Sequence, residues 1–461
     1  MTVVILESAD IQVFCIANQN KMQKPIKVIP FLQLGLKVGV IMGIIFFFLQ
    51  ISGAAKAAAQ HSTTKYTLVA GPDSSVISAI QTAKTTGGLL YPLSVERLYA
   101  KNGNKLVWIA PERLQTHNWD AMLLLDCVVQ YGLIPTDYHP AELTYDQLHL
   151  LVENPEKVTE SQKADYDILL TDAMIALINN LHFGKLNVNF PPEKLDAGNF
   201  NGCHADLELA NALSTLNQED FLSAIENVQP KAKAYTNLQY HMHLITGVYT
   251  GDNYEFPESD IKKMAINMER LRWAENDNVT YIAVNIPSFM LEFHQPDTIY
   301  QFRVLAGNPA TPTASLESAI NTIQISKGWS ASSRRIYFTF YNRAGIYLGN
   351  TPEQSSFKQE DRAVSNGTLN IEHAQKLAAM LLVNDGNFKS VPLIVKALKK
   401  NEMRKFVLKQ KIPFKVTYIT CAVDEGVLVM YNDVYQLDQN LEMKLYNVTN
   451  TLALGLSAKN K

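Results

Sequence analysis

The hydrophobic pattern of this chain changes its period once, close to residue 273, and this change constrains the fold more than any other feature. Before it, apolar residues recur every three to four positions, as in 119–131 and 165–183, which end at Gly132 and Gly184. After it, apolar and polar residues alternate, as in 298–306. The first pattern is typical of amphipathic helices closed by a glycine, and the second of half-buried strands. We therefore predict an α+β protein in which a helical domain precedes a mainly-β domain.

The pattern also predicts individual elements. In the helical part, residues 98–108 are expected to form a short hairpin around Asn102 and Gly103, and Asn267 to Trp273 the end of a helix. In the β part, one helix is expected at 371–382, and Glu425 and Gly426 should form the turn of a last strand pair. Other helices are expected at 206–216, 221–228 and 235–248, and strands at 281–287, 289–293, 334–341, 346–348, 414–423 and 427–430. The predicted domains are 62–265 and 266–461.

Residues 1–59 have the features of a targeting segment. The run 38–51 is almost wholly apolar, Lys24, Lys27 and Lys37 precede it, and small residues follow it at 53–59. A positive flank, an apolar run and a small-residue exit are the parts of a secretory signal peptide, with cleavage expected near residues 57–59. An uncleaved N-terminal anchor is the alternative, and translation could begin at Met1 or Met22. Either alternative predicts export, with membrane contact only through an uncleaved leader.

Composition excludes several classes of partner and chemistry. The 461-residue chain carries a formal net charge of −3, which implies no nucleic-acid partner. Its four cysteines show no spacing typical of metal ligands. We therefore expect neither a metal nor a cofactor.

The stretch from Asp361 to Asn370, DRAVSNGTLN, carries the strongest signal in the chain. It resembles the active-site signature of the L,D-transpeptidases, which cross-link bacterial peptidoglycan with a cysteine nucleophile. Ser365, Gly367, Leu369 and Asn370 match this signature, whereas Asn366 stands at the family's His position and Thr368 at its Cys position.

A second stretch resembles the segment of the same family that carries the base histidine. Residues 347–352 read YLGNTP, and Gly349 occupies the position of the histidine that would activate the thiol. The chain is therefore identified as a degenerate member that lacks the catalytic Cys and His. A cysteine at 368 with a histidine at 349 would be expected to recover a lowered thiol pKa.

Further matches cover nearly all of the chain after residue 60. They resemble the scaffold domain and the catalytic domain of the large L,D-transpeptidases of Gram-negative bacteria. Two parts of these enzymes are not found: the small peptidoglycan-binding module, and a lid segment between Trp329 and Tyr337. The resemblance implies an open, shallow cleft in a periplasmic protein. The matching residues are Tyr99, Gly103, Trp108, Gly132, Leu133, Pro135, Tyr138, Asp167, Leu170, Thr171 and the stretches 267–273, 412–420 and 432–438.

These observations favour a pseudoenzyme that binds peptidoglycan peptide stems or a wall-synthesis protein without catalysis. Tyr347, Arg362 and Ser365 are candidate ligand-binding residues. One alternative is an active L,D-transpeptidase that uses Thr368 or Ser365 with His373 as base, oriented by the carboxylate of Asp361 or Glu372. Another is a purely structural exported protein that has no affinity for muropeptides.

Overall fold

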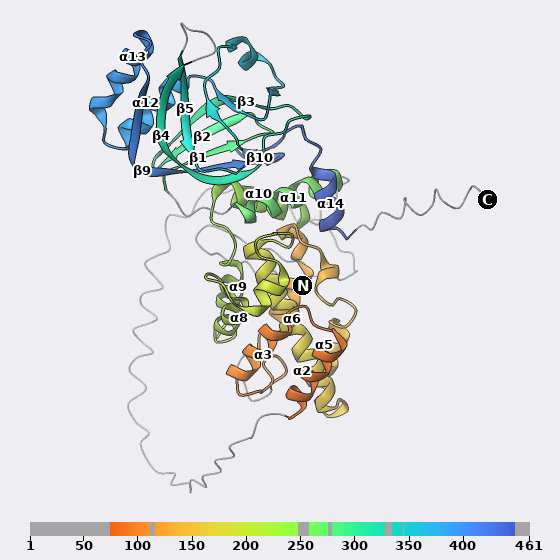
Figure 1. Cartoon of the computed structure of the whole chain (residues 1–461). Coiled ribbons are helices and arrows are strands. Elements are labelled where there is room, and N and C mark those ends of the chain that lie inside the picture. Colours follow the sequence, from red (N-terminus) through yellow and green to blue (C-terminus); the bar gives the residue numbers. More distant parts are fainter. Residues whose placement is uncertain are drawn as a thin grey trace, which may run out of the picture. The chain divides into compact units, whose positions relative to one another are not determined.

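The structure, a computed structural model, describes residues 74–110, 116–247, 258–274, 279–327, 334–343 and 345–447. The signal peptide or anchor predicted for 1–59 lies outside these ranges. Within them, no helix is both long enough and apolar enough to span a membrane. The described residues belong to one compact unit, and Figure 1 shows the order of its helices and strands along the chain.

The amino-terminal half of this unit is helical, as predicted. Its central helix is α6, which begins after a capping box formed by Thr159 and Gln162 and ends before Gly184. Ten α-helices are described up to residue 273: α2 (Ser74–Thr86), α3 (Pro92–Lys101), α4 (Asn118–Asp126), α5 (Tyr145–Glu153), α6 (Glu160–Phe183), α7 (Pro192–Ala197), α8 (Ala205–Ala212), α9 (Gln218–Glu226), α10 (Lys233–Gly247) and α11 (Glu258–Trp273).

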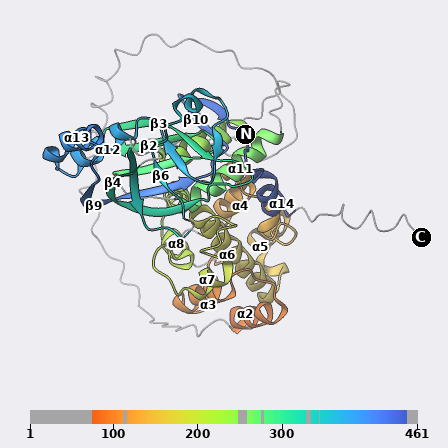
Figure 2. The ribbon, with the colours of Figure 1, turned by 45° about the horizontal axis from the view of Figure 1, so that its top comes forward.

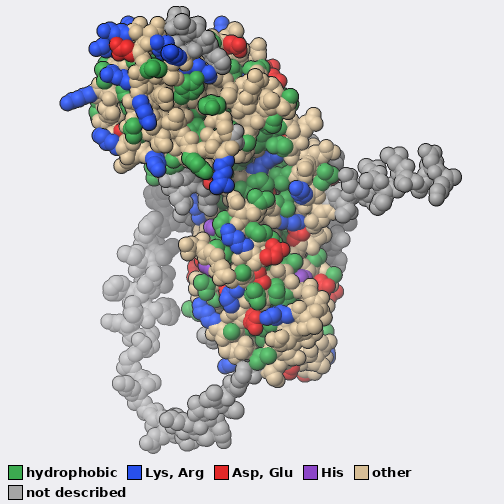
Figure 3. Space-filling model, in the orientation of Figure 1, with side chains coloured by type: hydrophobic (Ala, Val, Ile, Leu, Met, Phe, Trp, Pro, Cys, Tyr) green, Lys and Arg blue, Asp and Glu red, His purple; other side chains and the backbone are tan. Residues whose placement is uncertain are grey.

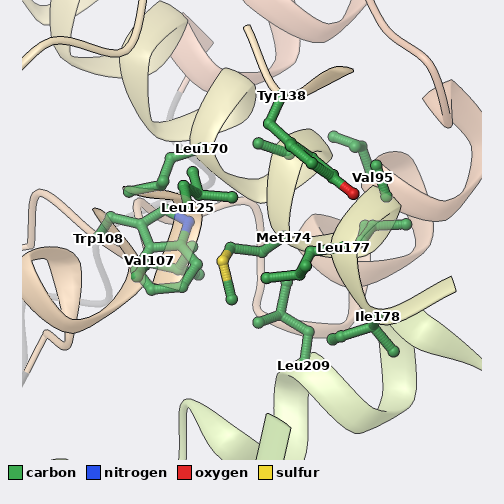
Figure 4. Packing of buried hydrophobic residues seen from close by; sticks show 14 of the residues in the cluster. Val95, Val107, Trp108, Leu125, Tyr138, Leu170, Met174, Leu177, Ile178 and Leu209 are labelled. Carbon is green, nitrogen blue, oxygen red and sulfur yellow. The ribbon is translucent and has the colours of Figure 1, made fainter. Parts of the chain in front are cut away.

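Helix α6 is buried along most of its length, and the hydrophobic core of the helical half forms around it. Figure 4 shows Leu170, Met174, Leu177 and Ile178 of this helix packed among side chains from its neighbours, Trp108 included. A buried helix with apolar residues all round is stabilised mainly by this packing, because deleting one such side chain costs about 2–5 kcal/mol.

The predicted hairpin at 98–108 is wrong. Residues up to 101 form helix α3, which begins with Pro92 in its first turn, where the missing N–H of proline costs nothing. Residues 107–109 form a bend and pair with no strand, because Asp167 on α6 accepts hydrogen bonds from their backbone N–H groups. A buried carboxylate thus takes the place of the expected partner strand.

The second half is built on a nine-stranded sheet in the order β2-β1-β9-β4-β5-β6-β8-β3-β7. Because β2 also pairs with β3, the sheet closes on itself as a barrel, which Figures 1 and 2 show from two sides. The α+β class is confirmed. The strands are β1 (Tyr281–Asn285), β2 (Met290–Gln295), β3 (Thr298–Gly307), β4 (Leu316–Lys327), β5 (Arg334–Phe340), β6 (Leu348–Gly349), β7 (Ala363–Ser365), β8 (Leu369–Ile371) and β9 (Arg404–Thr417).

The chain beyond the signature departs from the prediction in two places. The expected helix is α12 (Ala374–Asn384), but a second helix, α13 (Val391–Lys399), follows it. The pair β10 (Cys421–Asp424) and β11 (Val427–Met430) is confirmed with its turn, whereas 414–417 belongs to β9, which lies between β1 and β4. The chain leaves β9 at Ile419, whose N–H and carbonyl bond to the Asn285 amide.

Helix α11 joins the two halves through buried polar contacts. Nη2 of Arg272 donates to the carbonyl of Tyr131 over 2.5 Å, and Oε1 of Glu269 accepts from the N–H of Leu186 over 2.6 Å. Met264, Ala265, Ile266 and Met268 of this helix pack with Cys421 of β10 and Leu445 of α14 (Asp438–Leu445). The helix is continuous through residue 265, where the boundary between the two domains was predicted.

Candidate functional site

A cleft of about 760 Å³ opens on the barrel where the two signature stretches meet. Its lining comes from β3, β5, β7 and β8, from the residue directly before β6, and from the turns that follow β6 and β7. Five of the residues singled out in the sequence lie in it: Tyr347, Ser365, Asn366, Thr368 and Asn370. The structure therefore brings together two stretches that are separate in the chain. The other lining residues are Leu305, Arg335, Tyr337, Thr351, Pro352, Glu353 and Val364.

The pairing of β6 with β8 produces this convergence. The two short strands are parallel, with Leu348 opposite Leu369 and Gly349 opposite Asn370. The N–H of Leu369 also donates to the carbonyl of Tyr347 over 2.8 Å. Neighbouring strands lie about 4.8 Å apart, so a side chain at 349 would lie beside the residues around 368. Position 349 is thus adjacent to the loop that carries Thr368.

Thr368 has an amide neighbour instead of a base. Nδ2 of Asn370 donates to Oγ1 of Thr368 over 3.3 Å, so a lone pair of the hydroxyl is already engaged by a donor that accepts no proton. Oγ of Ser365 donates to the backbone carbonyl of Thr368, which fixes the loop. A hydroxyl needs a close, strong base to become a nucleophile, and no His or Cys lies among the lining residues described.

Gly349 is packed so tightly that the missing base has no room. A Cβ atom built on it would lie 2.5 Å from the carbonyl oxygen of Ile336 on β5, far inside ordinary contact. The same carbonyl accepts the N–H of Asn350 over 3.1 Å, and the side chain of Asn350 accepts the N–H of Ile336 over 2.8 Å. The backbone of β5 therefore fills the space in which a histidine side chain would begin.

Gly367 turns the chain between β7 and β8. Its φ of 75° is a left-handed conformation that favours glycine, and the hydroxyl of Thr313 donates to its carbonyl over 3.3 Å. Behind it, Gly307 lies so close that a Cβ on that residue would be 2.3 Å from the carbonyl oxygen of Thr311. Two glycines thus allow the signature loop to lie against the end of β3.

The groups proposed for an active enzyme do not meet at Thr368. His373 caps α12 with a left-handed backbone, its side chain is 70% exposed, and its nearest described carboxylate is that of Glu372 at 4.0 Å. Oδ1 of Asp361 accepts the N–H of Ala363. None of these three residues lines the cleft.

Arg362 also lies outside the cleft lining. Its guanidinium bonds to the carbonyls of Gln359, Ser288 and Phe289 and lies 5.2 Å from the centre of the Phe289 ring. Burial is the main cause that lowers the pKa of Arg362. These contacts hold the guanidinium of Arg362 against the backbone and the Phe289 ring, outside the cleft.

The sequence reasoning missed two charged groups in the cleft, Arg335 and Glu353. The guanidinium of Arg335 lies 4.8 Å from the centre of the Tyr337 ring, which in turn meets the ring of Tyr347 edge-on at 6.4 Å. A cation, two aromatic rings and a carboxylate therefore border Thr368. Alternation along β5 could have indicated that residues 335 and 337 share a face.

Residues outside the cleft that resemble the family form hydrogen bonds that support the signature loop from behind. Arg270 on α11 bonds to Oδ1 of Asp438 over 2.6 Å, and Oδ2 of Asp433 accepts the N–H of Asp438. The hydroxyl of Tyr418 donates to Oδ1 of Asp433, and the hydroxyl of Tyr435 donates to the carbonyl of Gly307 over 2.7 Å. Residues of the stretches 267–273, 412–420 and 432–438, which resemble the family, thus form one polar network that ends behind the signature loop.

The scaffold matches in the helical half form a second cluster. Oδ1 of Asp167 accepts the hydroxyl of Tyr99 over 2.5 Å, while Oγ1 of Thr171 accepts Nε1 of Trp108 over 2.9 Å. All four side chains are buried. Burial is the largest influence on the carboxyl of Asp167 and raises its pKa, against the hydrogen bonds that it accepts. This cluster fixes the fold and contains no reactive group. In the described ranges, no group of His, Cys, Asp and Glu is placed to hold a metal.

Comparisons with known proteins agree with these observations. A family model with the description "Scaffold domain" matches residues 94–242. A protein of Haemophilus influenzae named "Putative L,D-transpeptidase" is 24% identical over 252 residues, which cover 41% of this chain and 51% of the relative. The chain therefore spans about half the length of the curated relative that it matches.

Proposed function

We propose that this chain is an exported, catalytically inactive member of the L,D-transpeptidase-like family that serves in peptidoglycan biogenesis. Its cleft would hold a peptide stem without transferring it. A wall-synthesis protein that carries or delivers such stems would be the second partner. Catalytic inactivity, export and binding are all parts of the proposal, and periplasmic location follows from it together with the predicted leader.

The observation that carries the proposal is the environment of Thr368. Acyl transfer requires a nucleophile to lose its proton as it attacks, and the amide of Asn370 donates to this hydroxyl instead of accepting from it. Gly349 has no side chain, and β5 occupies the space next to it. Because nucleophile and base act as a unit, the loss of both lowers the rate by several powers of ten.

The rest of the cleft supports binding. Arg335 can pair with a carboxylate and Glu353 with an amine, and both line the same cleft as the exposed ring of Tyr347. A peptide stem that carries both charges along an extended backbone has complementary groups. We therefore expect affinity to depend on Arg335, Glu353 and Tyr347, and not on the hydroxyl of Thr368.

Catalysis is tested by incubating the purified protein with disaccharide-tetrapeptide donors and following cross-links and protein adducts by mass spectrometry. We expect neither product. A cross-link or acyl adduct that Thr368→Ala abolishes would show that the protein is an enzyme and would refute the inactive half of the proposal.

Binding is tested separately by co-sedimentation with purified sacculi and by titration with soluble muropeptides. Arg335→Gln should weaken muropeptide binding about tenfold or more, which is the scale of one lost charge-assisted bond. Arg334→Gln is the matched control, because Nε of Arg334 bonds to the carbonyl of Asn401 and its side chain does not line the cleft. If the parent protein, Arg335→Gln and Arg334→Gln bound muropeptides with equal affinity, binding in this cleft would be contradicted.

A further inference from the structure

Helix α13 has an outward face that the cleft does not use. The short 3-10 turn Phe388–Ser390 runs directly into this helix. Because Pro392, Val395 and Lys399 of α13 are spaced by three and four positions, they lie on one side of the helix, and all three are exposed. Ile394 and Ala397 on the opposite side are buried in the barrel core. The side chain of Phe388 is 65% exposed, which is unusual for an aromatic ring.

Lysines surround these exposed apolar residues. We define the α13 patch as Phe388, Lys389, Val395, Lys396, Lys399 and Lys400, all of which are exposed. Figure 3 shows Lys and Arg side chains gathered over the part of the surface where Figure 1 places α13.

The charge of this region stands out against the rest of the chain. Residues 386–411 contain eight of the 41 Lys and Arg and one of the 44 Asp and Glu, although the whole chain has a net charge of −3. Among the described residues, none of the four patch lysines lies within ion-pair distance of a carboxylate; the fifteen pairs found are elsewhere. Exposed lysines normally alternate with acids, so an unbalanced group of them produces a local positive field.

We propose that the α13 patch docks on the surface of a phospholipid bilayer that contains anionic lipids. Lysines are attracted to anionic headgroups, and an exposed ring flanked by lysines can enter the boundary between headgroups and acyl chains. A soluble polyanion would use the lysines but would leave Phe388 and Val395 in water. The combination of the two residue types therefore favours a lipid surface. Docking there is independent of the cleft and of any anchor in residues 1–59.

The strength expected for this contact is set by the lysines. Each lysine near an anionic surface is worth about fivefold in affinity, so neutralising four should weaken the contact more than about 100-fold. The attraction falls off within about 10 Å at 0.1 M salt and about 3 Å at 1 M. Docking should therefore be lost at high salt, unlike the insertion of an apolar anchor.

The test uses the full chain and a reporter inside the patch, because the apolar run 38–51 could itself bind vesicles. Phe388→Trp adds a fluorophore at the patch. Its emission is obtained by subtracting the spectrum of the parent protein, which has four tryptophans of its own. Vesicles of phosphatidylethanolamine with phosphatidylglycerol should shift this emission to the blue, and pure phosphatidylcholine should not. Adding K389Q, K396Q, K399Q and K400Q should abolish the shift and reduce flotation with the vesicles. Circular dichroism confirms that each variant is folded.

The control carries the same change of charge in the helical half: K101Q, K105Q, K157Q and K233Q, all at exposed lysines. It should keep the blue shift. Three results would overturn the proposal: no shift with anionic vesicles, an equal shift with phosphatidylcholine, or an equal loss in the control. A soluble polyanion such as heparin that produces the same shift would assign the patch to polyanions in general and would also overturn it.

Discussion

Replacing Gly349 tests the account of the lost base most directly. A Cβ at this position would lie 2.5 Å from the carbonyl oxygen of Ile336, where ordinary contact begins at 3.4 Å. Ile336 cannot simply move away, because β5 pairs with β4 on its other side, with Ile336 opposite Ile325. Gly349→Ala should therefore lower the free energy of unfolding by about 1–3 kcal/mol, the usual cost of overpacking.

The assay is urea denaturation of Gly349→Ala beside the parent and a matched glycine variant. Gly88→Ala is suitable, because its added Cβ would meet its nearest atom at 3.5 Å, and we expect a change within about 0.5 kcal/mol. If the two variants were equally stable, the steric argument would be refuted. The crowding at Gly349 also revises the expectation from sequence: Thr368→Cys with Gly349→His should leave the thiol pKa near its ordinary value.

Three further predictions follow from contacts elsewhere in the structure. In Thr368→Cys with Asn370→His, an imidazole replaces the amide 3.3 Å from Oγ1 of Thr368, so peptide-resolved alkylation against pH should show a lower thiol pKa than Thr368→Cys alone. Asp167→Ala leaves three buried N–H groups without an acceptor and should lower the free energy of unfolding by at least about 3 kcal/mol. The control Asp165→Ala, at an exposed position on the same helix, should change it by less than about 0.5 kcal/mol. Burial lowers the pKa of His243, so the folded state favours the neutral ring. The contribution of this ring to the free energy of unfolding is complete above the ordinary pKa of 6.5 and is lost as the pH falls below it. His243→Gln should therefore flatten the dependence of the unfolding free energy on pH in this range.

The sequence was informative where local chemistry decides the structure. Glycines ended α6 and the helical segment before Gly132, and buried residues alternate along β1 and β2. It failed where tertiary contacts decide. Residues 98–108 read as a hairpin because the pattern cannot reveal that Asp167, sixty residues away in the chain, accepts the N–H groups of 107–109. Strand β4 was not predicted because its alternation breaks where its register against β9 shifts between Ile320 and Thr322.

The site was predictable to a different extent. Residues 347–352 and 361–370 were singled out by resemblance, and the pairing of Gly349 with Asn370 could not have been obtained from spacing alone. Glu353 was missed because it directly follows the recognised stretch 347–352 without belonging to it, and Arg335 because it lies in the predicted strand 334–341, outside both recognised stretches. The closeness of Ile336 to Gly349 was also beyond reach, since a sequence shows that a side chain is absent but not what fills its place.

The position of β9 has a consequence for how the protein is made. This strand lies between β1 and β4, yet it is synthesised more than one hundred residues after β1. In a growing chain that has not yet released residue 417, the earlier strands belong to one open sheet, because β2 pairs with β3, and the sheet edges at β1 and β4 have no partner. Such long-range pairing slows folding and leaves strand edges exposed to other chains. The barrel can therefore close only after β9 has left the ribosome.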